Sequence, residues 1–232
     1  MSITFLLIPS ITFGAIAFDV ATNGGSTSAS SHTFSHTATT TENGIIFVGA
    51  YGGTGVDFVT GITYGGEAMT EIAKRNPAHT GTNHVSYLYY LLSPSTGAND
   101  VVISASQSVF ISGGAATYTG VRQSGVPDAT VSNGGTGSSL TTITTTTVDN
   151  AWVVMLATTQ GAQTAGTGST ARTNTSISWD IFDSGGAITP AGGYSMTTNG
   201  VEGGIGHITA SFAPVAEAPP ALPTLFSQII WW

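Results

Sequence analysis

Helical periodicity is hard to find in this chain, and this absence constrains the fold more than any other feature. The sequence consists of β-branched and aromatic runs that Gly, Asn and Pro interrupt, which is the pattern of a β-sandwich or barrel. Residue types predict loops at Gly52–Gly55 and Ser132–Gly137. The predicted strands are Ile11–Val20, His32–Thr39, Gly44–Tyr51, Asp57–Tyr64, Glu67–Lys74, His84–Leu92, Asp100–Ala105, Val109–Thr119, Leu140–Thr147, Ala151–Thr159, Ile177–Phe182, Gly193–Thr198 and Gly206–Phe212.

The clearest local signal is a hairpin within Val59–Ile72. Two alternating runs flank Gly65-Gly66, and glycine supplies the positive φ that a two-residue hairpin loop needs. A short helix over Glu67–Arg75 is the competing interpretation, and we favour the hairpin. Further along, Ala151–Leu156 is nearly continuously apolar, as expected of a central strand that is covered on both faces.

Charge and composition exclude several classes of function. Only 7% of the 232 residues are charged, against about 25% in ordinary globular proteins. The net charge is −8, whereas nucleic acid and anionic membrane surfaces are bound through Lys and Arg. Cysteine is absent, which removes disulfides and thiolate chemistry. We therefore expect neither a nucleic-acid partner nor an anionic membrane partner.

The first 18 residues carry no charged side chain, so a targeting role has to be weighed. A secretory signal needs a basic start and an uninterrupted apolar run, and polar residues and Pro9 interrupt this one. Pro9 also argues against a membrane-inserting helix of about 20 apolar residues. Short strands with a break at Pro9 fit better, so we predict an N-terminal strand-forming arm over 1–19, with a signal peptide as the alternative.

The C-terminal segment has two apolar faces. It follows a proline-rich stretch, Ala213–Pro223, and both faces would need cover if it were extended. Docking onto a neighbouring subunit and folding back onto the same domain are both open. We predict a linker and anchoring tail over 215–232, and an assembly interface formed by both ends: Leu225, Phe226, Ile229, Ile230, Trp231, Trp232, Ile3, Phe5, Ile11 and Phe13.

Four motifs follow one another along the chain: Thr63–Thr70 (Thr-Tyr-Gly-Gly-Glu-Ala-Met-Thr), Tyr89–Gly97, Tyr118–Val121 and Ala210–Pro214. In this order they resemble uncharacterised jelly-roll-like β-sandwich domains of phage structural proteins and bacterial surface proteins. The resemblance covers about residues 20–214. It implies a jelly-roll-like sandwich and no family-wide activity.

No catalytic pattern stands out. Hydrolysis of sugars needs two carboxylates across a cleft, and the candidates Glu67, Glu71, Asp180, Asp183 and Glu202 form no signature pair. Serine chemistry lacks the nucleophile-elbow motif. We therefore expect a protein that is not an enzyme.

Metal and sugar binding are the remaining site classes. His32 and His36 share one strand face with Phe34, and we interpret the two histidines as surface or rim residues; His79, His84 and His207 show no informative spacing. We expect no cofactor, although Asn99-Asp100, Asp149-Asn150 and the Trp179–Asp183 run keep a structural calcium open. For a carbohydrate-binding module, the stacking candidates are Tyr87, Tyr89, Trp152 and Trp179.

The sequence thus predicts an all-β, antiparallel, jelly-roll-like sandwich over 20–214. The predicted function is a structural subunit of a large assembly, most of all a phage virion protein such as a capsid decoration (cement) protein or a tail component. Its partners would be further copies of itself and other structural proteins of the assembly, with a glycan as a further option. The alternatives are an extracellular filament or cell-surface layer linked by strand exchange, with Ile3–Val20 as the donated strand, and a carbohydrate-binding module.

Overall fold

The computed structural model of this protein describes residues 14–39, 42–173, 178–200 and 203–216. Within these ranges every regular element is a β-strand and all pairings are antiparallel, so the predicted antiparallel β-sandwich is confirmed. None of the described residues forms a helix that is long and apolar enough to cross a bilayer.

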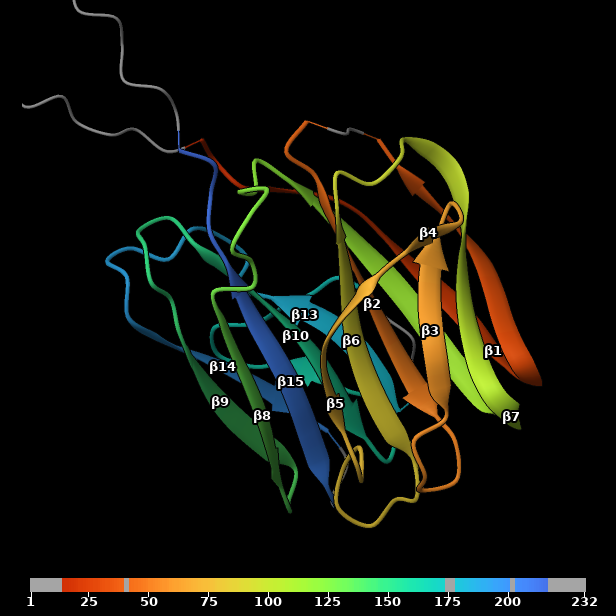
Figure 1. The fold of residues 1–232 in the computed structure, drawn as a ribbon. Coiled ribbons are helices and arrows are strands. Elements are labelled where there is room, and N and C mark those ends of the chain that lie inside the picture. The colour runs from red at the N-terminus through yellow and green to blue at the C-terminus, as the bar shows by residue number, and fades with distance from the viewer. Residues whose placement is uncertain (1–13, 40–41, 174–177, 201–202, 217–232) are drawn as a thin grey trace, which may run out of the picture.

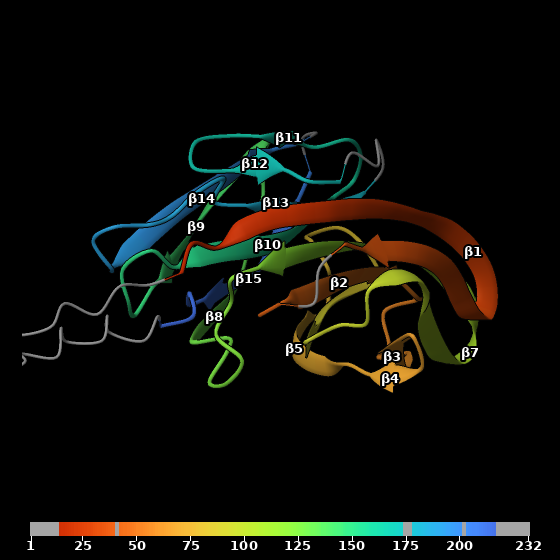
Figure 2. The ribbon, with the colours of Figure 1, turned by 90° about the horizontal axis from the view of Figure 1, so that it is seen from above.

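The largest sheet has seven strands and is strongly curved (Figures 1 and 2). Its order is β4-β3-β7-β2-β6-β5, and β1 pairs with the remaining edge of β7. Register shifts interrupt the long β1–β7 ladder at three places, and bulges of this kind bend a sheet. The strands are β1 (Ala17–Ala38), β2 (Ile45–Gly52), β3 (Val59–Tyr64), β4 (Glu67–Ala68), β5 (Thr70–Arg75), β6 (Val85–Leu92) and β7 (Gly97–Thr119).

Two smaller sheets complete the molecule. One has five strands in the order β12-β13-β10-β15-β8, and the other has three in the order β11-β14-β9. They contain β8 (Ala129–Gly135), β9 (Ser139–Thr145), β10 (Trp152–Thr159), β11 (Thr164–Ala165), β12 (Thr170–Ala171), β13 (Trp179–Asp183), β14 (Gly193–Asn199) and β15 (Ile205–Phe212). Figure 2 shows the five-stranded sheet between the other two.

Three hydrophobic clusters fill this arrangement, and several strands contribute to two of them, as β2 and β10 illustrate. In β2, alternate residues face the five-stranded sheet or the inside of the curved sheet. In β10, alternate residues face the curved sheet or the three-stranded sheet. Successive side chains of a strand point to opposite faces, so a strand between two cores must be apolar throughout. This arrangement confirms the prediction that Ala151–Leu156 belongs to a covered central strand.

The predicted hairpin is also confirmed. Tyr64 pairs with Glu67 across a turn in which Gly65 and Gly66 have φ values of 58° and 85°. The alternative helix over Glu67–Arg75 is wrong, because this stretch forms β4 and β5. Packing of β5 beside β6 outweighs the helical spacing of its charges.

Several predicted boundaries are wrong. The stretches Asp100–Ala105 and Val109–Thr119 are one strand, β7, because β1 runs along both of them. The predicted loop Ser132–Gly137 is largely part of β8, which β15 holds through backbone pairing. Gly134 in this strand leaves room for the Arg75 side chain, because a Cβ on Gly134 would lie 1.8 Å from the Arg75 guanidinium.

Candidate functional site

The two ends of the described chain meet at one pole of the sandwich. The Gly14 N–H donates to the Val215 carbonyl at 2.9 Å, and the Val215 N–H donates to the Gly120 carbonyl at 2.9 Å. Pro214 forms a bridge with Val121 next to them. Figure 1 shows the chain entering and leaving the fold at this place. We call it the terminal pole, defined by Gly14, Gly120 and Val215.

The predicted assembly interface lies outside the described residues: Ile3, Phe5, Ile11, Phe13, Leu225, Phe226, Ile229, Ile230, Trp231 and Trp232. The terminal pole therefore gives only the positions from which both segments extend. Near the predicted arm boundary, Ile16 is part of the core and residues 17–19 belong to β1.

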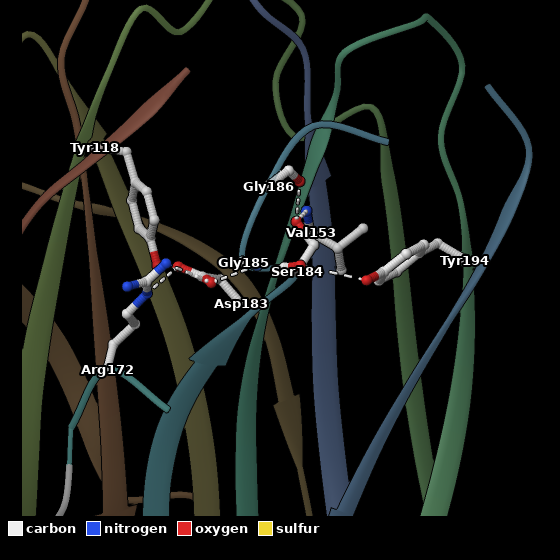
Figure 3. A network of polar contacts seen from close by, with 8 residues as sticks. All are labelled: Tyr118, Val153, Arg172, Asp183, Ser184, Gly185, Gly186 and Tyr194. Atoms are coloured by element: carbon white, nitrogen blue, oxygen red, sulfur yellow. Dashed lines mark hydrogen bonds and ion pairs between the residues drawn. The ribbon is translucent and has the colours of Figure 1, made fainter. Parts of the chain in front are cut away.

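The four candidate carboxylates that the structure describes do not form an open acidic pair. Asp183 is fully buried, and Arg172 binds it from Nε at 2.5 Å and from a terminal nitrogen at 3.0 Å (Figure 3). The Tyr118 hydroxyl donates to the same carboxylate at 2.9 Å. Burial, together with the Asp183 charge, raises the pKa of Tyr118 well above its ordinary value. This network holds β13 against β7, so Asp183 has a structural role.

The other carboxylates are dispersed. Asp180 is buried and accepts a hydrogen bond from Thr173 at 3.2 Å. Glu71 accepts from the Tyr89 hydroxyl at 2.8 Å, Glu67 is exposed on β4, and Glu202 lies outside the described residues.

The interpretation of His32 and His36 as surface or rim residues is wrong, because both are buried on the inner face of β1. His36 lies between the hydroxyls of Thr22 at 2.8 Å and Thr117 at 2.6 Å. Desolvation lowers the pKa of His36 to about 4, although the charge of Asp19 opposes this shift. The hydroxyls satisfy both ring nitrogens, so His36 is a neutral core residue.

Two of the calcium candidates are engaged in protein hydrogen bonds. The Asn99 amide donates to the Thr96 carbonyl at 3.1 Å, a contact typical of Asx residues at turns. Asp149 accepts from the N–H of Ala191, which is 42 positions away in the sequence, at 2.7 Å and so joins two loops. No group of three or more His, Cys, Asp or Glu side chains in the described ranges could hold a metal ion.

The four predicted sugar-stacking residues Tyr87, Tyr89, Trp152 and Trp179 are all buried. Each ring fills a core between strands or sheets. Trp179 also donates from its indole nitrogen to the Ser112 hydroxyl at 2.6 Å. A sugar cannot reach these faces, so the predicted platform is wrong.

The structure instead forms a pocket that the sequence did not reveal. It has a volume of about 420 Å³ and is lined by Ser26, Tyr51, His84, Phe110 and Ser178. These residues come from distant parts of the chain, so no local spacing marks them. One local signal existed: Phe110 shares a strand face with Ser108 and Ser112, between the inward-facing Val109 and Ile111.

A hydrogen-bond network fixes the polar wall of this pocket. Nδ1 of His79 contacts the Thr80 carbonyl at 3.1 Å, so it carries the proton and Nε2 is an acceptor. The Tyr51 hydroxyl lies 2.7 Å from Nδ1 of His84 and 3.4 Å from Nε2 of His79. Burial lowers the pKa of both imidazoles, so both are neutral at pH 7.

Comparisons with known proteins add no relative. A scan against protein-family models finds no match for this chain, and a search of curated proteins finds no similar sequence. Functional conclusions therefore rest on the geometry described above.

Proposed function

We propose that this protein is a non-enzymatic structural subunit of a large assembly, joined to its neighbours through residues 1–13 and 217–232. The observation that carries the proposal is the Gly14–Val215 hydrogen bond at the terminal pole. It makes two segments with many apolar side chains extend from one place. Two such segments, both attached at this pole, would together bury more apolar area against a neighbour than either could alone.

The exposed strand faces support this proposal. Outward positions of β1 carry Ser31, Thr33, Ser35 and Thr37, and those of β9 include Thr141 and Thr145. Hydroxyl-rich faces with few charges can pack against similar faces with a small desolvation penalty, because charged groups are the expensive ones to bury.

Within this class, we propose a phage virion protein, either a capsid decoration (cement) protein or a tail component. Jelly rolls are common in viral capsids, which is an argument from fold alone. The alternative is a subunit of an extracellular filament or surface layer. It is favoured by β1, which pairs with β7 along one edge and, among the described strands, with none along the other. An open edge is a template for a strand from another chain.

Strand exchange would have one restriction. Ala17 and Val20 already pair with Thr119 and Thr117 of the same chain. A donated strand would therefore come from residues before Ala17 and not from the whole of Ile3–Val20.

The test compares the full chain with chains that lack residues 1–13, residues 217–232 or both, using analytical ultracentrifugation and electron microscopy. We expect the truncated chains to keep the sandwich and to lose self-association or incorporation into the particle. A matched pair of full-length double variants tests whether the apolar side chains of the tail, and not only its length, are needed. Ile230→Ser combined with Trp231→Ser should impair assembly, whereas Thr224→Ser combined with Gln228→Ser should not. Normal incorporation of the doubly truncated chain would refute the proposal.

A further experiment separates virion from filament. Electron microscopy of the native source should place the protein on phage particles if the virion proposal holds. Localisation to a cellular filament, with a processed N-terminus, would favour strand exchange instead.

A further inference from the structure

The pocket lies at the opposite end of β2 from the terminal pole. Ile45, at one end of β2, pairs with Tyr118 close to Gly120. Tyr51, at the other end, lines the pocket. A strand rises about 3.3 Å per residue, so the two places are roughly 20 Å apart along the sandwich. A subunit held at the terminal pole would therefore leave this pocket open.

One wall of the pocket is an uncovered aromatic ring. Phe110 is 38% exposed and is among the few large apolar side chains with that much exposure in the described chain. Along β7 it continues the face formed by Ser112, Gly114 and Ala116, which packs against the five-stranded sheet. The ring centroids of Phe110 and His84 lie 5.9 Å apart, so the two rings form adjoining sides of the pocket.

The other walls supply neutral hydrogen-bonding groups. The Tyr51 hydroxyl, at 2.7 Å, and the Thr82 hydroxyl, at 3.0 Å, both contact Nδ1 of His84, so Nε2 is the ring nitrogen that remains for a ligand. Nε2 of His84 has no hydrogen-bond partner among the described residues. Ser26 and Ser178 add hydroxyl groups, and none of the described lining residues is charged.

We propose that this pocket binds a neutral, polyhydroxylated ring, that is, one sugar unit of a glycan. The apolar face of such a ring would lie on Phe110, and its hydroxyls would bond to Nε2 of His84 and to the two serines. The pocket volume of about 420 Å³ falls within the range of small-ligand sites. The neutral lining disfavours phosphorylated or carboxylated ligands, since anions are held by cationic groups or several backbone amides.

The proposal does not rest on the assembly role, because the described lining residues, from Ser26 to Ser178, all belong to the sandwich. It also differs from the predicted sugar platform, whose four aromatic residues are buried. Phe110 and His84 replace them as the recognition residues.

The test is saturation-transfer difference NMR on the full chain with a panel of methyl glycosides of neutral hexoses, deoxyhexoses and N-acetylhexosamines. Inorganic phosphate and indole serve as comparison probes. Phosphate is tested by its ability to displace a bound glycoside. The best glycoside is then titrated by calorimetry. We expect saturation transfer to at least one glycoside, and competition by neither comparison probe.

Three variants make the assignment specific. Phe110→Ser should weaken binding by about tenfold or more, a change equivalent to about 1.4 kcal/mol. His84→Phe should also weaken it, because the substitution removes the hydrogen-bonding Nε2. Ile143→Ser is the matched control, because Ile143 is an exposed apolar residue (60%) on another sheet. The glycoside affinity of this variant should equal that of the parent protein. Circular dichroism checks that each variant folds.

The proposal would be overturned if no glycoside of the panel showed saturation transfer. It would also be overturned if indole or phosphate bound more tightly than every glycoside. Glycoside binding that survives both Phe110→Ser and His84→Phe would also overturn it, because the sugar would then bind elsewhere. Since truncation of residues 1–13 and 217–232 should leave glycoside affinity unchanged, failure of one proposal is distinguishable from failure of the other.

Discussion

Lowering the pH from 7 to 5 should markedly destabilise this fold, because two buried histidines must stay neutral in it. His207 is fully buried and lies between the hydroxyls of Thr142 and Thr198, each at 2.8 Å. Desolvation lowers the pKa of His207 to about 3, with a smaller contribution from the nearby Arg75 charge. His36, in its similar hydroxyl cage, has a pKa lowered to about 4, mainly by desolvation.

The sign and size of the effect follow from proton linkage. An unfolded histidine takes up a proton near pH 6.5, whereas these two take one up in the fold only near pH 3 to 4. Their contribution to stability is fully present above pH 6.5 and declines as the pH falls towards the folded-state pKa. Between pH 7 and 5, each histidine removes about 2 kcal/mol, or about 4 kcal/mol together.

This loss is large against a typical unfolding free energy of about 5–15 kcal/mol. It does not depend on the folded-state pKa values in detail, since pH 5 lies above both. His32, His79 and His84 also have lowered pKa values and act in the same direction. The carboxyl pKa of Asp57, lowered chiefly by its hydrogen bond with Lys74, affects stability only at more acidic pH.

The assay is urea unfolding at pH 7, 6 and 5, followed by tryptophan fluorescence, since Trp152 and Trp179 are buried. His207→Gln and His36→Gln each remove one titrating group and keep an amide that can bond to the surrounding hydroxyls. Each variant should be less stable than the parent at pH 7 and should have a pH slope smaller by up to about 1.4 kcal/mol per unit. An unfolding free energy that stays constant from pH 7 to 5 would refute this reasoning.

Two further substitutions test the packing between sheets. Arg172→Met leaves Asp183 buried without its ion-pair partner and should reduce the unfolding free energy by about 3–5 kcal/mol; Arg172→Lys should recover part of that loss, and equal loss in both variants would argue against charge pairing. Gly114→Ala places a Cβ 2.6 Å from both the Trp179 ring and the Thr22 carbonyl. It should destabilise by about 1–3 kcal/mol and alter tryptophan fluorescence, and a neutral result would mean that β1 and β13 can move apart.

Much of the fold could be predicted from the sequence, because strand periodicity is a local property. The hairpin at Gly65-Gly66 follows from residue type alone. The continuous apolar run of β10 indicates burial on two faces, and the three-layered arrangement supplies both cores. The edges were harder to predict: β8 is rich in Gly, Ser and Asn, and only its pairing with β15 makes it a strand.

The candidate site could not be predicted in the same way, because its residues meet only through long-range pairing. Tyr51 and His84 come together because β2 and β6 are paired neighbours. The aromatic residues that stood out in the sequence did so because they lie in apolar runs, and apolar runs form the core. The informative aromatic residue was Phe110, which interrupts a polar strand face.

The position of the pocket follows from a mismatch in strand length between the two packed sheets. Strand β7 spans Gly97–Thr119, whereas β13, which packs beside it, spans only Trp179–Asp183. The shorter strand covers β7 from Tyr118, which bonds to Asp183, to Ser112, which bonds to the Trp179 indole. Phe110 is the next residue on that face, lies beyond the start of β13 at Trp179 and is 38% exposed. The terminal pole lies at the other end of β7, just beyond Thr119, so the proposed attachment and the proposed recognition would use separate ends of one sandwich.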